Sequence, residues 1–253
     1  MDYQTVKVRF DGPICFLQLN RPEAGNAINS LLVEECGRVL DACETSIPVI
    51  VLEGLPAVFC PGADFSEIAL GMENGNTGPN PEPLYELWLR LATGPYVTVA
   101  HVRGKVNAGG MGFVAACDIV LADDKAVFSL SELLFGLFPA CVLPFLVRRI
   151  GFQKAHYLTL TTAPVPVQSA YEWGLVDAYE PESDALVRKH LLRLRRLSKT
   201  GIMRYKRYME GLWDLPRRAK SDAIRANKEI FSDPNILEGI VRYAEEGKFP
   251  WQT

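Results

Sequence analysis

The chain has 253 residues, of which 48% are hydrophobic and 23% are charged, and its formal net charge is −3. This length and composition are typical of a globular protein with one large domain or two small ones. The negative charge argues against general nucleic-acid binding, no apolar run approaches the ~20 residues of a membrane helix, and the polar N-terminus does not resemble a signal peptide.

The cysteines and histidines indicate neither a disulfide framework nor a metal site. No two cysteines form a C-x-x-C pair, and the chain, which has three histidines, contains no H-E-x-x-H motif. We therefore expect reduced core thiols in a cytoplasmic protein without a bound metal. The cysteines are Cys15, Cys36, Cys43, Cys60, Cys117 and Cys141.

The N-terminal part of the chain predicts a β-hairpin, a helix and a buried strand. Asp11, Gly12 and Pro13 are turn-forming residues between two short apolar segments, which is typical of a hairpin. Asn29 or Ser30 can cap a helix whose apolar residues recur at three- and four-residue spacing. The predicted bounds are 6–10 and 14–19 for the hairpin strands, 29–44 for the helix and 48–52 for the buried strand.

A turn rich in glycine and proline follows at 54–64 and leads into a helix that begins at Phe65. Residues 72–83 are dominated by asparagine, glycine and proline, so we expect a mobile surface loop there. Such a loop can gate a site or can be a tolerated insertion, and the composition does not distinguish between the two. A helix at 85–91 is predicted next.

A strand at 96–102 then runs through a glycine-rich turn at 104–112 into a helix at 113–117. The first turn of such a helix has backbone N–H groups without intrahelical partners and carries partial positive charge. The turn can therefore bind an anion or oxyanion. Alternatively, its glycines only permit close packing of the helix on the strand.

Two glycine-bearing turns, at 62–64 and 108–110, each join a predicted strand to a predicted helix. If they lie side by side, the amides of Ala63 and Gly109 can both point at one oxygen. A pair of fixed donors aimed at a developing enolate oxygen contributes roughly 2.7–4 kcal/mol per donor in comparable sites.

Strands at 119–122 and 126–129 precede Glu132, and the alternation of strands with helices predicts an α/β fold with parallel βαβ units. Beyond Gly136 the pattern is helical. We divide the chain into a core at 1–197 and a C-terminal helical region at 198–253, which we expect to pack against a neighbouring subunit. Helices are predicted at 144–150, 153–161, 168–173, 183–197, from 202 toward 231, and at 239–247.

A set of short motifs is spaced along nearly the whole chain. They are L-N-R-P-E-A-G-N-A at 19–27, F-C-P-G-A-D-F at 59–65, G-K-V-N-A-G-G-M-G at 104–112, A-C-D-I at 116–119, F-S-L-S-E-L-L-F-G at 128–136 and E-W-G-L-V-D at 172–177. In order and separation they resemble the crotonase (enoyl-CoA hydratase/isomerase) superfamily. The resemblance implies a spiral of ββα units, a helical trimerisation region, and thioester substrates whose enolate is held by two backbone N–H groups, here those of Ala63 and Gly109.

Typical hydratases of that superfamily carry two glutamates, and this chain departs from the pattern. The later glutamate matches Glu132, but Gly112 replaces the earlier one, so Glu132 would act alone or with a different partner. Its apolar neighbours favour a raised pKa suited to proton transfer, although a salt-bridged surface carboxylate is the alternative. Asp64 follows an oxyanion donor and could bind a hydroxyl or water, or could simply cap a helix.

Longer stretches narrow the resemblance to the dehydratases of bacterial polyketide β-branching (HMG-synthase) cassettes. These enzymes convert 3-hydroxy-3-methylglutaryl-acyl carrier protein to 3-methylglutaconyl-acyl carrier protein, on which a decarboxylase of the same superfamily then acts. The resemblance implies a syn elimination with Glu132 as single acid and base and without a cofactor, on an acyl group carried by phosphopantetheine or CoA. The stretches lie at 82–88, 93–98, 101–110, 129–146, 188–197 and in the F-P-W end.

Ala24 is a candidate substrate contact in addition to Ala63, Asp64 and Gly109. The 3-hydroxy-3-methylglutaryl group has a second carboxylate far from the thioester, and the candidates for binding this distal carboxylate are Tyr85, Arg90 and Lys105. Carrier proteins are acidic, so we expect a basic surface that receives them. Its core would be Arg188, Lys189, Arg193 and Arg196, extended by Arg195, Lys199, Arg204, Lys206 and Arg207. A solvated amphipathic helix is the alternative interpretation of this segment, and the carrier could also dock near Arg148, Arg149 and Lys154.

The sequence therefore leaves three functional hypotheses, with a homotrimer or a dimer of trimers as the expected assembly. The first is the carrier-bound dehydratase. The second is a hydratase or isomerase that acts on soluble CoA thioesters. The third is a catalytically silent scaffold of a polyketide synthase assembly, because one of the two usual glutamates is missing.

Overall fold

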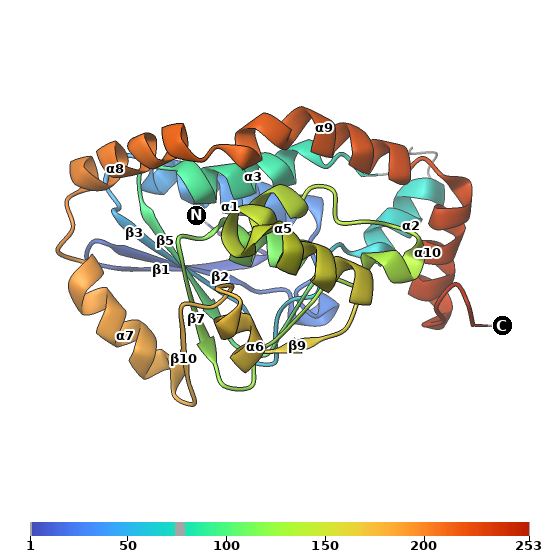
Figure 1. The fold of residues 1–253 in the computed structure, drawn as a ribbon, viewed down its shortest axis with the longest axis horizontal. Coiled ribbons are helices and arrows are strands. Elements are labelled where there is room, and N and C mark those ends of the chain that lie inside the picture. The colour runs from blue at the N-terminus through green and yellow to red at the C-terminus, as the bar shows by residue number, and fades with distance from the viewer. Residues whose placement is uncertain (1, 74–78, 253) are drawn as a thin grey trace.

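A computed structural model describes residues 2–73 and 79–252, which form two β-sheets surrounded by helices (Figure 1). The larger sheet has the strand order β1-β2-β3-β5-β7-β10. The predicted hairpin is confirmed, because β1 and β2 pair in antiparallel register around Gly12, whose φ is 55°. The other neighbours in this sheet are parallel. Its strands are β1 Val6–Asp11, β2 Ile14–Leu19, β3 Val49–Glu53, β5 Val97–Val102, β7 Ile119–Asp123 and β10 Ala178–Glu180.

Both faces of this sheet are buried, as the apolar runs predicted. Along β3, Ile50 and Leu52 face the main core, whereas Val49 and Val51 face a second apolar cluster that includes Leu186 of helix α7 (Ser183–Leu194). Such two-sided burial is typical of parallel sheets. The alternation of strands with helices, and the parallel pairing predicted from it for the first half of the chain, are confirmed.

The smaller sheet, which the sequence did not predict as a unit, has the order β4-β6-β8-β9. Strands β4, β6 and β8 are parallel to one another, and β9 is antiparallel to β8. Each strand has only two or three residues, too few for a periodic pattern to identify it. Their bounds are β4 Val58–Cys60, β6 Lys105–Asn107, β8 Val127–Ser129 and β9 Val165–Pro166.

Helices of the first two thirds of the chain pack on these sheets and on one another. The predicted helix start is confirmed at Asn29, whose side chain accepts a hydrogen bond from the Leu32 amide at 2.9 Å. The two helices predicted around residue 152 form one element with a break at Gly151, where φ is 75°. The helices are α1 Ser30–Cys43, α2 Phe65–Glu73, α3 Glu82–Thr93, α4 Gly109–Ala116, α5 Leu143–Thr161, α6 Val167–Glu172 and two short 3₁₀ turns at Pro22–Ala24 and Glu132–Phe135.

Part of the expected loop at 72–83 is helical, because α2 continues to Glu73 and α3 begins at Glu82. Only residues 79–81 of that stretch are described without regular structure, and residues 74–78 lie outside the described residues. The prediction of a loop is therefore wrong at both of its ends.

The single long helix predicted from 202 toward 231 is two helices, α8 (Lys199–Leu212) and α9 (Leu215–Ile230). The break is at Trp213, which has φ −151° and ψ 85°, and Pro216 lies in the first turn of α9. Proline is compatible with the first turn of a helix but not with its interior, which explains the interruption. Helix α10 (Pro234–Glu246) then packs against α2 (Figure 1).

Lysines fasten α8 to the core. Lys206 is buried; its Nζ donates to the carbonyls of Leu91 (3.3 Å) and Tyr96 (2.9 Å) and pairs with Asp118 at 2.8 Å. Lys199 Nζ donates to the carbonyl of Cys43, the last residue of α1, and to the carbonyl of Ile47 in the following loop. Both lysines were predicted to extend the basic surface for a carrier protein. That prediction is wrong for Lys206, which is buried in its ion pair with Asp118, and the ammonium of the partly exposed Lys199 is bonded to backbone carbonyls.

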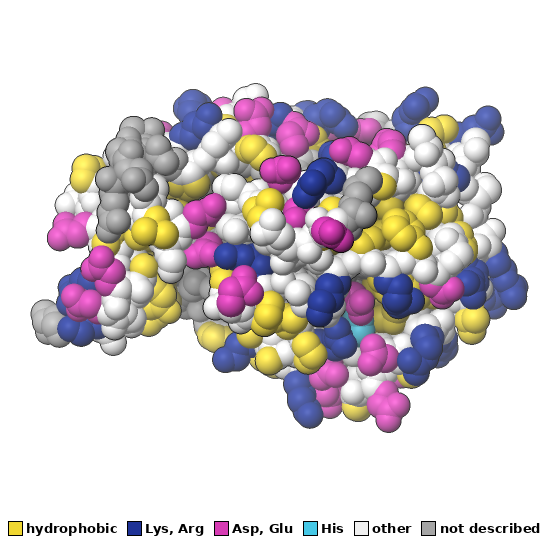
Figure 2. Space-filling view, turned by 180° about the vertical axis from the view of Figure 1, so that it is seen from behind, with side chains coloured by type: hydrophobic (Ala, Val, Ile, Leu, Met, Phe, Trp, Pro, Cys, Tyr) yellow, Lys and Arg dark blue, Asp and Glu magenta, His cyan; other side chains and the backbone are white. Residues whose placement is uncertain are grey.

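The expected state of the cysteines is confirmed, since all six are free and buried. Within residues 2–73 and 79–252, no helix combines the length and the apolar character that crossing a bilayer requires. Charge is dispersed on the face shown in Figure 2, where basic and acidic side chains alternate over most of the surface.

Candidate active site

A large cavity, of about 1440 Å³, lies between the smaller sheet and helices α1, α2, α3 and α10. The predicted residues Ala24, Ala63, Asp64, Gly109 and Glu132 all line it. Its wall is largely apolar and aromatic, which suits an acyl chain better than a highly charged ligand. Aromatic contributors are Phe65, Trp88, Phe135, Phe138, Phe231, Tyr243 and Phe249.

Three parallel strands deliver the central groups. Strand β4 leads into the turn that contains Ala63, β6 leads into the turn that contains Gly109, and β8 leads toward Glu132. Because β4 pairs with β6 and β6 pairs with β8 in parallel register, all three carboxyl ends meet at one edge of the sheet. Groups that lie 46 and 23 residues apart in sequence are thereby brought to one place without long loops.

The turns that carry Ala63 and Gly109 touch each other. A Cβ atom added to Gly62 would lie 2.8 Å from the Cβ of Ala108 and 3.3 Å from the nitrogen of Gly109. A Cβ added to Gly109 would lie 3.9 Å from the nitrogen of Ala63. Glycine is required at position 62 for this approach, and also because its φ is 109°. The side-by-side arrangement expected of the two turns is therefore present.

Both candidate donors are free. The Ile28 amide donates to the Gly62 carbonyl at 2.8 Å and the Asp64 amide donates to the Ile28 carbonyl at 2.9 Å, so the Ala63 N–H between them points to the opposite side. Gly109 is the first residue of α4, where an N–H has no intrahelical acceptor. Neither amide donates to any group in the described part of the chain.

Backbone strain sets the start of α4. Ala108 has φ 48° and ψ −124°, a conformation that normally requires glycine. Such strain costs on the order of 1–3 kcal/mol and persists only where the surrounding structure imposes it. Here the residue before Ala108, Asn107, is held in place by two hydrogen bonds. Its Nδ2 donates to Ser131 Oγ at 2.7 Å, and its Oδ1 accepts from Ser129 Oγ at 2.8 Å. These bonds connect the Gly109 turn to the loop that carries Glu132.

Glu132 has the properties expected of a proton carrier. Its Oε2 is buried and, among the described residues, has no hydrogen-bond partner. Removal from water raises the pKa of Glu132 to about 7, against a smaller opposing effect of the amides of Glu132 and Ser131. The alternative of a salt-bridged surface carboxylate is excluded, because no cation pairs with Glu132 in the part of the chain that the structure describes.

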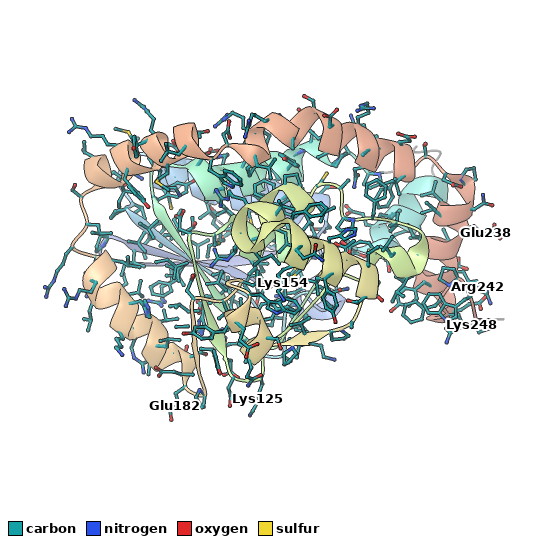
Figure 3. The ribbon with its side chains drawn as sticks, viewed as in Figure 1. Lys125, Lys154, Glu182, Glu238, Arg242 and Lys248 are labelled. Carbon is teal, nitrogen blue, oxygen red and sulfur yellow. The ribbon has the colours of Figure 1, made fainter. Side chains whose placement is uncertain are left out.

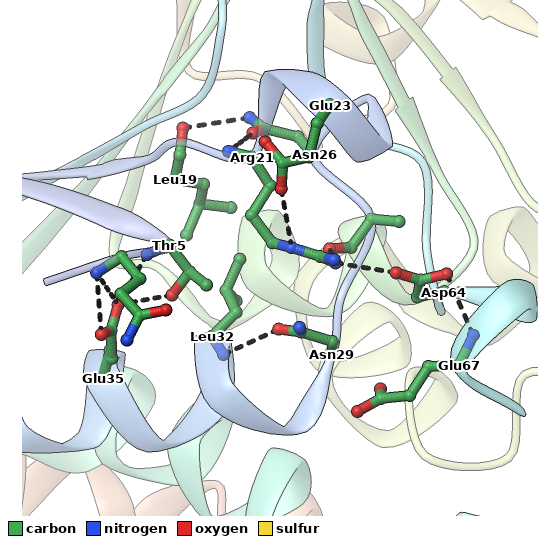
Figure 4. Close-up of polar contacts among 12 residues, drawn as sticks. Thr5, Leu19, Arg21, Glu23, Asn26, Asn29, Leu32, Glu35, Asp64 and Glu67 are labelled. Carbon is green, nitrogen blue, oxygen red and sulfur yellow. Dashed lines mark hydrogen bonds and ion pairs between the residues drawn. The ribbon is translucent and has the colours of Figure 1, made fainter. Parts of the chain in front are cut away.

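Asp64 acts as a cap and an ion-pair partner (Figure 4). Its Oδ1 accepts from the amides of Ser66 (3.1 Å) and Glu67 (3.3 Å), which identifies it as the cap of α2. Its Oδ2 pairs with Arg21 Nη1 at 2.9 Å, and both side chains are nearly buried. The same Arg21 nitrogen donates to the Ala27 carbonyl at 2.7 Å. Arg21, which the sequence did not single out, thus fixes the loop around Ala24 to the turn that carries Ala63.

We expect replacements of Asp64 to change stability more than chemistry. Asp64→Asn keeps a capping oxygen but removes the charged partner at Arg21 Nη1 and leaves Arg21 with only the exposed Glu23 as an acidic partner, so the free energy of unfolding should fall by about 1–3 kcal/mol. Asp64→Ala also loses the cap, which adds about 1 kcal/mol. Urea denaturation measures both changes. A loss of turnover in folded Asp64→Asn that far exceeds its loss of stability would instead give Asp64 a role in the reaction.

The space next to Gly112 explains the missing glutamate. A Cβ atom there would lie 2.4 Å from Cζ2 and 2.5 Å from Cε2 of Trp88, so no larger side chain fits beside this ring. Trp88 is held edge-on against Phe113 and Phe145, each with ring centroids 5.9 Å away. This contact could not be predicted from the sequence, because Trp88 lies in a different helix, α3, whose apolar pattern is ordinary.

Of the three candidates for binding the distal carboxylate, only Arg90 lines the cavity. Tyr85 is fully buried, its hydroxyl donates to the Pro216 carbonyl at 2.6 Å, and it does not line the cavity. Lys105 is exposed on β6 and also lies away from the cavity lining. Arg90 does line the cavity, but its guanidinium pairs with Asp41 at 2.7 Å. The structure therefore excludes Tyr85 and Lys105 as lining residues and retains Arg90 with a competing partner.

The basic residues of α7, and Arg196 just after it, do not line this cavity. Arg188, Lys189, Arg193 and Arg196 are exposed, and no acidic side chain of the described residues pairs with them. Figure 3 places Glu182, where α7 begins, far from Arg242 and Lys248 at the end of α10, which borders the cavity. The other proposed docking residues, Arg148 and Arg149, donate to carbonyls of the core.

One cluster outside the cavity has the composition of a metal site. Ligand atoms of Glu53, His101 and Asp184 lie within 4.8 Å of one another. Both imidazole nitrogens of His101 already have partners, Glu53 Oε1 at 3.0 Å and Ser183 Oγ at 2.9 Å. This network joins α7 to strands β3 and β5 of the large sheet, and we assign it a structural role.

Comparisons with known proteins agree with this geometry. The family model for enoyl-CoA hydratase/isomerase matches residues 9–253. The bacillaene synthase dehydratase PksH of Bacillus subtilis is 62% identical over 252 residues, 99% of this chain and 97% of that protein. The mevalonyl-coenzyme A hydratase sidH of Aspergillus fumigatus is 30% identical over 259 residues, 97% of this chain and 94% of that protein. The crystal structure of the pksH protein from Bacillus subtilis superimposes with a TM-score of 0.96 at 61% identity and covers 98% of this chain and 100% of that one.

Proposed function

The chain belongs to the enoyl-CoA hydratase/isomerase family, and from this membership we propose that it removes water from a 3-hydroxy-3-methylglutaryl group on an acyl carrier protein. The product is the 3-methylglutaconyl thioester. The α/β crotonase fold predicted from the sequence is confirmed by the match to solved structures. Trimerisation by the C-terminal helices stays a prediction.

One observation carries this proposal. Two peptide N–H groups and the buried Oε2 of one carboxylate, all without partners among the residues that the structure describes, line a single cavity at the ends of three adjacent parallel strands. The donors suit the developing charge of a thioester enolate, and the carboxylate suits proton transfer at neutral pH. Gly112 stands where typical hydratases of the family have their earlier glutamate, and this supports elimination by one acid and base rather than water activation by two.

The reaction follows from these groups. The amides of Ala63 and Gly109 polarise the thioester carbonyl and make a C2 proton acidic. Ionised Glu132 takes that proton, and the C2–H electrons pass through the enolate to form the C2–C3 double bond. The C3–O bond breaks, Glu132 returns the proton to the departing hydroxyl, and water leaves. Glu132 ends as the carboxylate, so the sequence of steps balances without a redox partner or cofactor.

The substrate class is supported by the relatives. The relative PksH is named a dehydratase of bacillaene synthase. We infer from this name that the acyl group of this chain's substrate is also carried by a protein. A mevalonyl group, like a 3-hydroxy-3-methylglutaryl group, has a hydroxyl and a methyl at C3. We propose that an acyl carrier protein is the partner and that a decarboxylase of the same superfamily acts next.

Mass spectrometry tests this function directly. The chain is incubated with 3-hydroxy-3-methylglutaryl-carrier protein and, in parallel, with the same acyl group on CoA. We expect the loss of one water from the carrier-bound group, at a much higher rate than from the CoA ester. Preference for the CoA ester would support the alternative of a hydratase on soluble thioesters. No water loss from either, with folded protein, would support a catalytically silent scaffold.

A further inference from the structure

Trp88 presents a polar group that the reaction scheme above does not use. Its side chain is 1% exposed and lines the cavity, and its Nε1 has no hydrogen-bond partner among the described residues. A buried indole N–H normally finds an acceptor, because leaving it unpaired costs on the order of 1–3 kcal/mol. Besides Trp88, Glu132 is the one cavity-lining residue of the described chain that has such an unpartnered buried atom.

The position of the indole relates it to the oxyanion turn. Gly112 lies three residues after Gly109 in α4, so both are on one face of that helix. The ring edge that packs on Gly112 contains Cε2, the atom bonded to Nε1, and it lies 2.5 Å from where a Cβ of Gly112 would be. The indole nitrogen, bonded to Cε2, is therefore close to the face of α4 at Gly112, and that face carries Gly109 one helical turn earlier.

We propose that the indole N–H of Trp88 donates a hydrogen bond to the C3 hydroxyl oxygen of the bound 3-hydroxyacyl thioester and stabilises that oxygen as it departs. This inference rests on the proposed dehydration and deepens it. When the C3–O bond breaks, its electron pair stays on oxygen until the proton from Glu132 arrives. A group that only donates can stabilise this transient charge, whereas it cannot act as a second base.

The proposed role of Trp88 also explains why residue 112 is glycine. The indole fills the space that a side chain at position 112 would need, so a hydroxyl-binding donor takes the place of a second carboxylate. The edge-on contacts with Phe113 and Phe145 leave the ring little freedom to turn, which fixes the direction of the N–H. Recognition would favour acyl thioesters with a hydroxyl at C3 over the same acyl groups without it.

An isosteric replacement separates the N–H from the ring. Benzothienylalanine, which has sulfur in place of the indole N–H, is introduced at position 88 by nonsense suppression. The matched control carries the same residue at Trp213, which is exposed. We expect the position-88 variant to lose water about 10- to 100-fold more slowly than the unmodified chain. We also expect it to retain full exchange of the C2 proton on the 3-deoxy thioester, because that step needs only Glu132 and the two amides.

The binding affinity for the two thioesters is a second measurement, and it does not require turnover. The unmodified chain should bind the 3-hydroxyacyl thioester more tightly than the 3-deoxy thioester, and the position-88 variant should lose this preference. An unchanged preference and an unchanged rate of water loss would overturn the proposal, as would equal losses of exchange and elimination. If the unmodified chain exchanges C2 protons but never releases water, the proposed function fails, while the preference in binding still decides the role of Trp88.

Discussion

Replacement of Glu132 by glutamine should lower the turnover of water loss by about 10³-fold or more, since general acid–base catalysis contributes 10²–10⁴-fold and one group here serves both steps. Glutamine has nearly the same shape, so the cavity is preserved. Stopped reactions analysed by mass spectrometry measure the rate. The matched control is Glu67→Gln, because Glu67 also lines the cavity but is exposed to water. Equal rates for the two variants would remove Glu132 from the reaction.

The raised pKa of Glu132 predicts two pH effects. Proton abstraction needs the ionised form, so kcat/KM of the unmodified chain should fall as pH drops below about 7. The free energy of unfolding has the opposite dependence on pH: it is larger at low pH, where Glu132 is protonated in the folded chain. Between pH 4.5 and about 7 the folded chain binds a proton that the unfolded chain has released, so the free energy of unfolding decreases as pH rises through this window.

Glu132→Gln removes this proton linkage. Above pH 7 the variant should be more stable than the unmodified chain by up to about 3 kcal/mol, and the difference should vanish toward pH 4.5. Chemical denaturation at a series of pH values measures the difference. A pH-independent difference would mean that Glu132 is not held in a raised-pKa environment.

Removal of the Ala63 donor should have the second largest effect. In Ala63→Pro the backbone N–H is lost, and the ring carbon takes the position toward which that hydrogen pointed. We expect kcat/KM to fall by at least about 10²–10³-fold. Stability should change little, because the Ala63 amide has no partner in the described part of the chain. Steady-state kinetics and a thermal melt measure the two quantities.

The matched control for this donor is Ala63→Gly, which keeps the N–H and alters only the side chain. It should retain most of the activity of the unmodified chain. Similar losses in the glycine and proline variants would show that the methyl group or the local backbone matters rather than the donor. Wild-type activity in a folded proline variant would eliminate the Ala63 amide from the oxyanion site.

The parts of the fold that the sequence predicted well are those with strong local signals. The hairpin around Gly12, the cap at Asn29 and the break at Gly151 each follow from residues with restricted backbone preferences or capping side chains. Of the short strands of the smaller sheet only β8 was predicted, at 126–129; β4, β6 and β9 were missed because their stability comes from pairing with distant segments. Their bounds could not be read from sequence, yet their parallel pairing is what brings Ala63, Gly109 and Glu132 together.

The site was predictable where backbone chemistry defines it and not where side chains meet across helices. The glycine turns and Glu132 were identified from motifs. Tyr85 was a wrong candidate because nothing in its own segment shows that its hydroxyl bonds to the Pro216 carbonyl. Trp88 and Arg21 were missed for the same reason, since their partners lie 24 and 43 residues away in sequence.

A crystal structure of the Glu132→Gln variant with an intact 3-hydroxyacyl thioester of pantetheine would test the central claim most directly. We predict that the thioester oxygen lies within about 3 Å of the nitrogens of both Ala63 and Gly109. The side chain at position 132 should then lie on the same side of the acyl group as the C2 hydrogen and the C3 hydroxyl. A thioester oxygen bound away from these amides, or a residue 132 turned away from the acyl group, would contradict the proposed elimination.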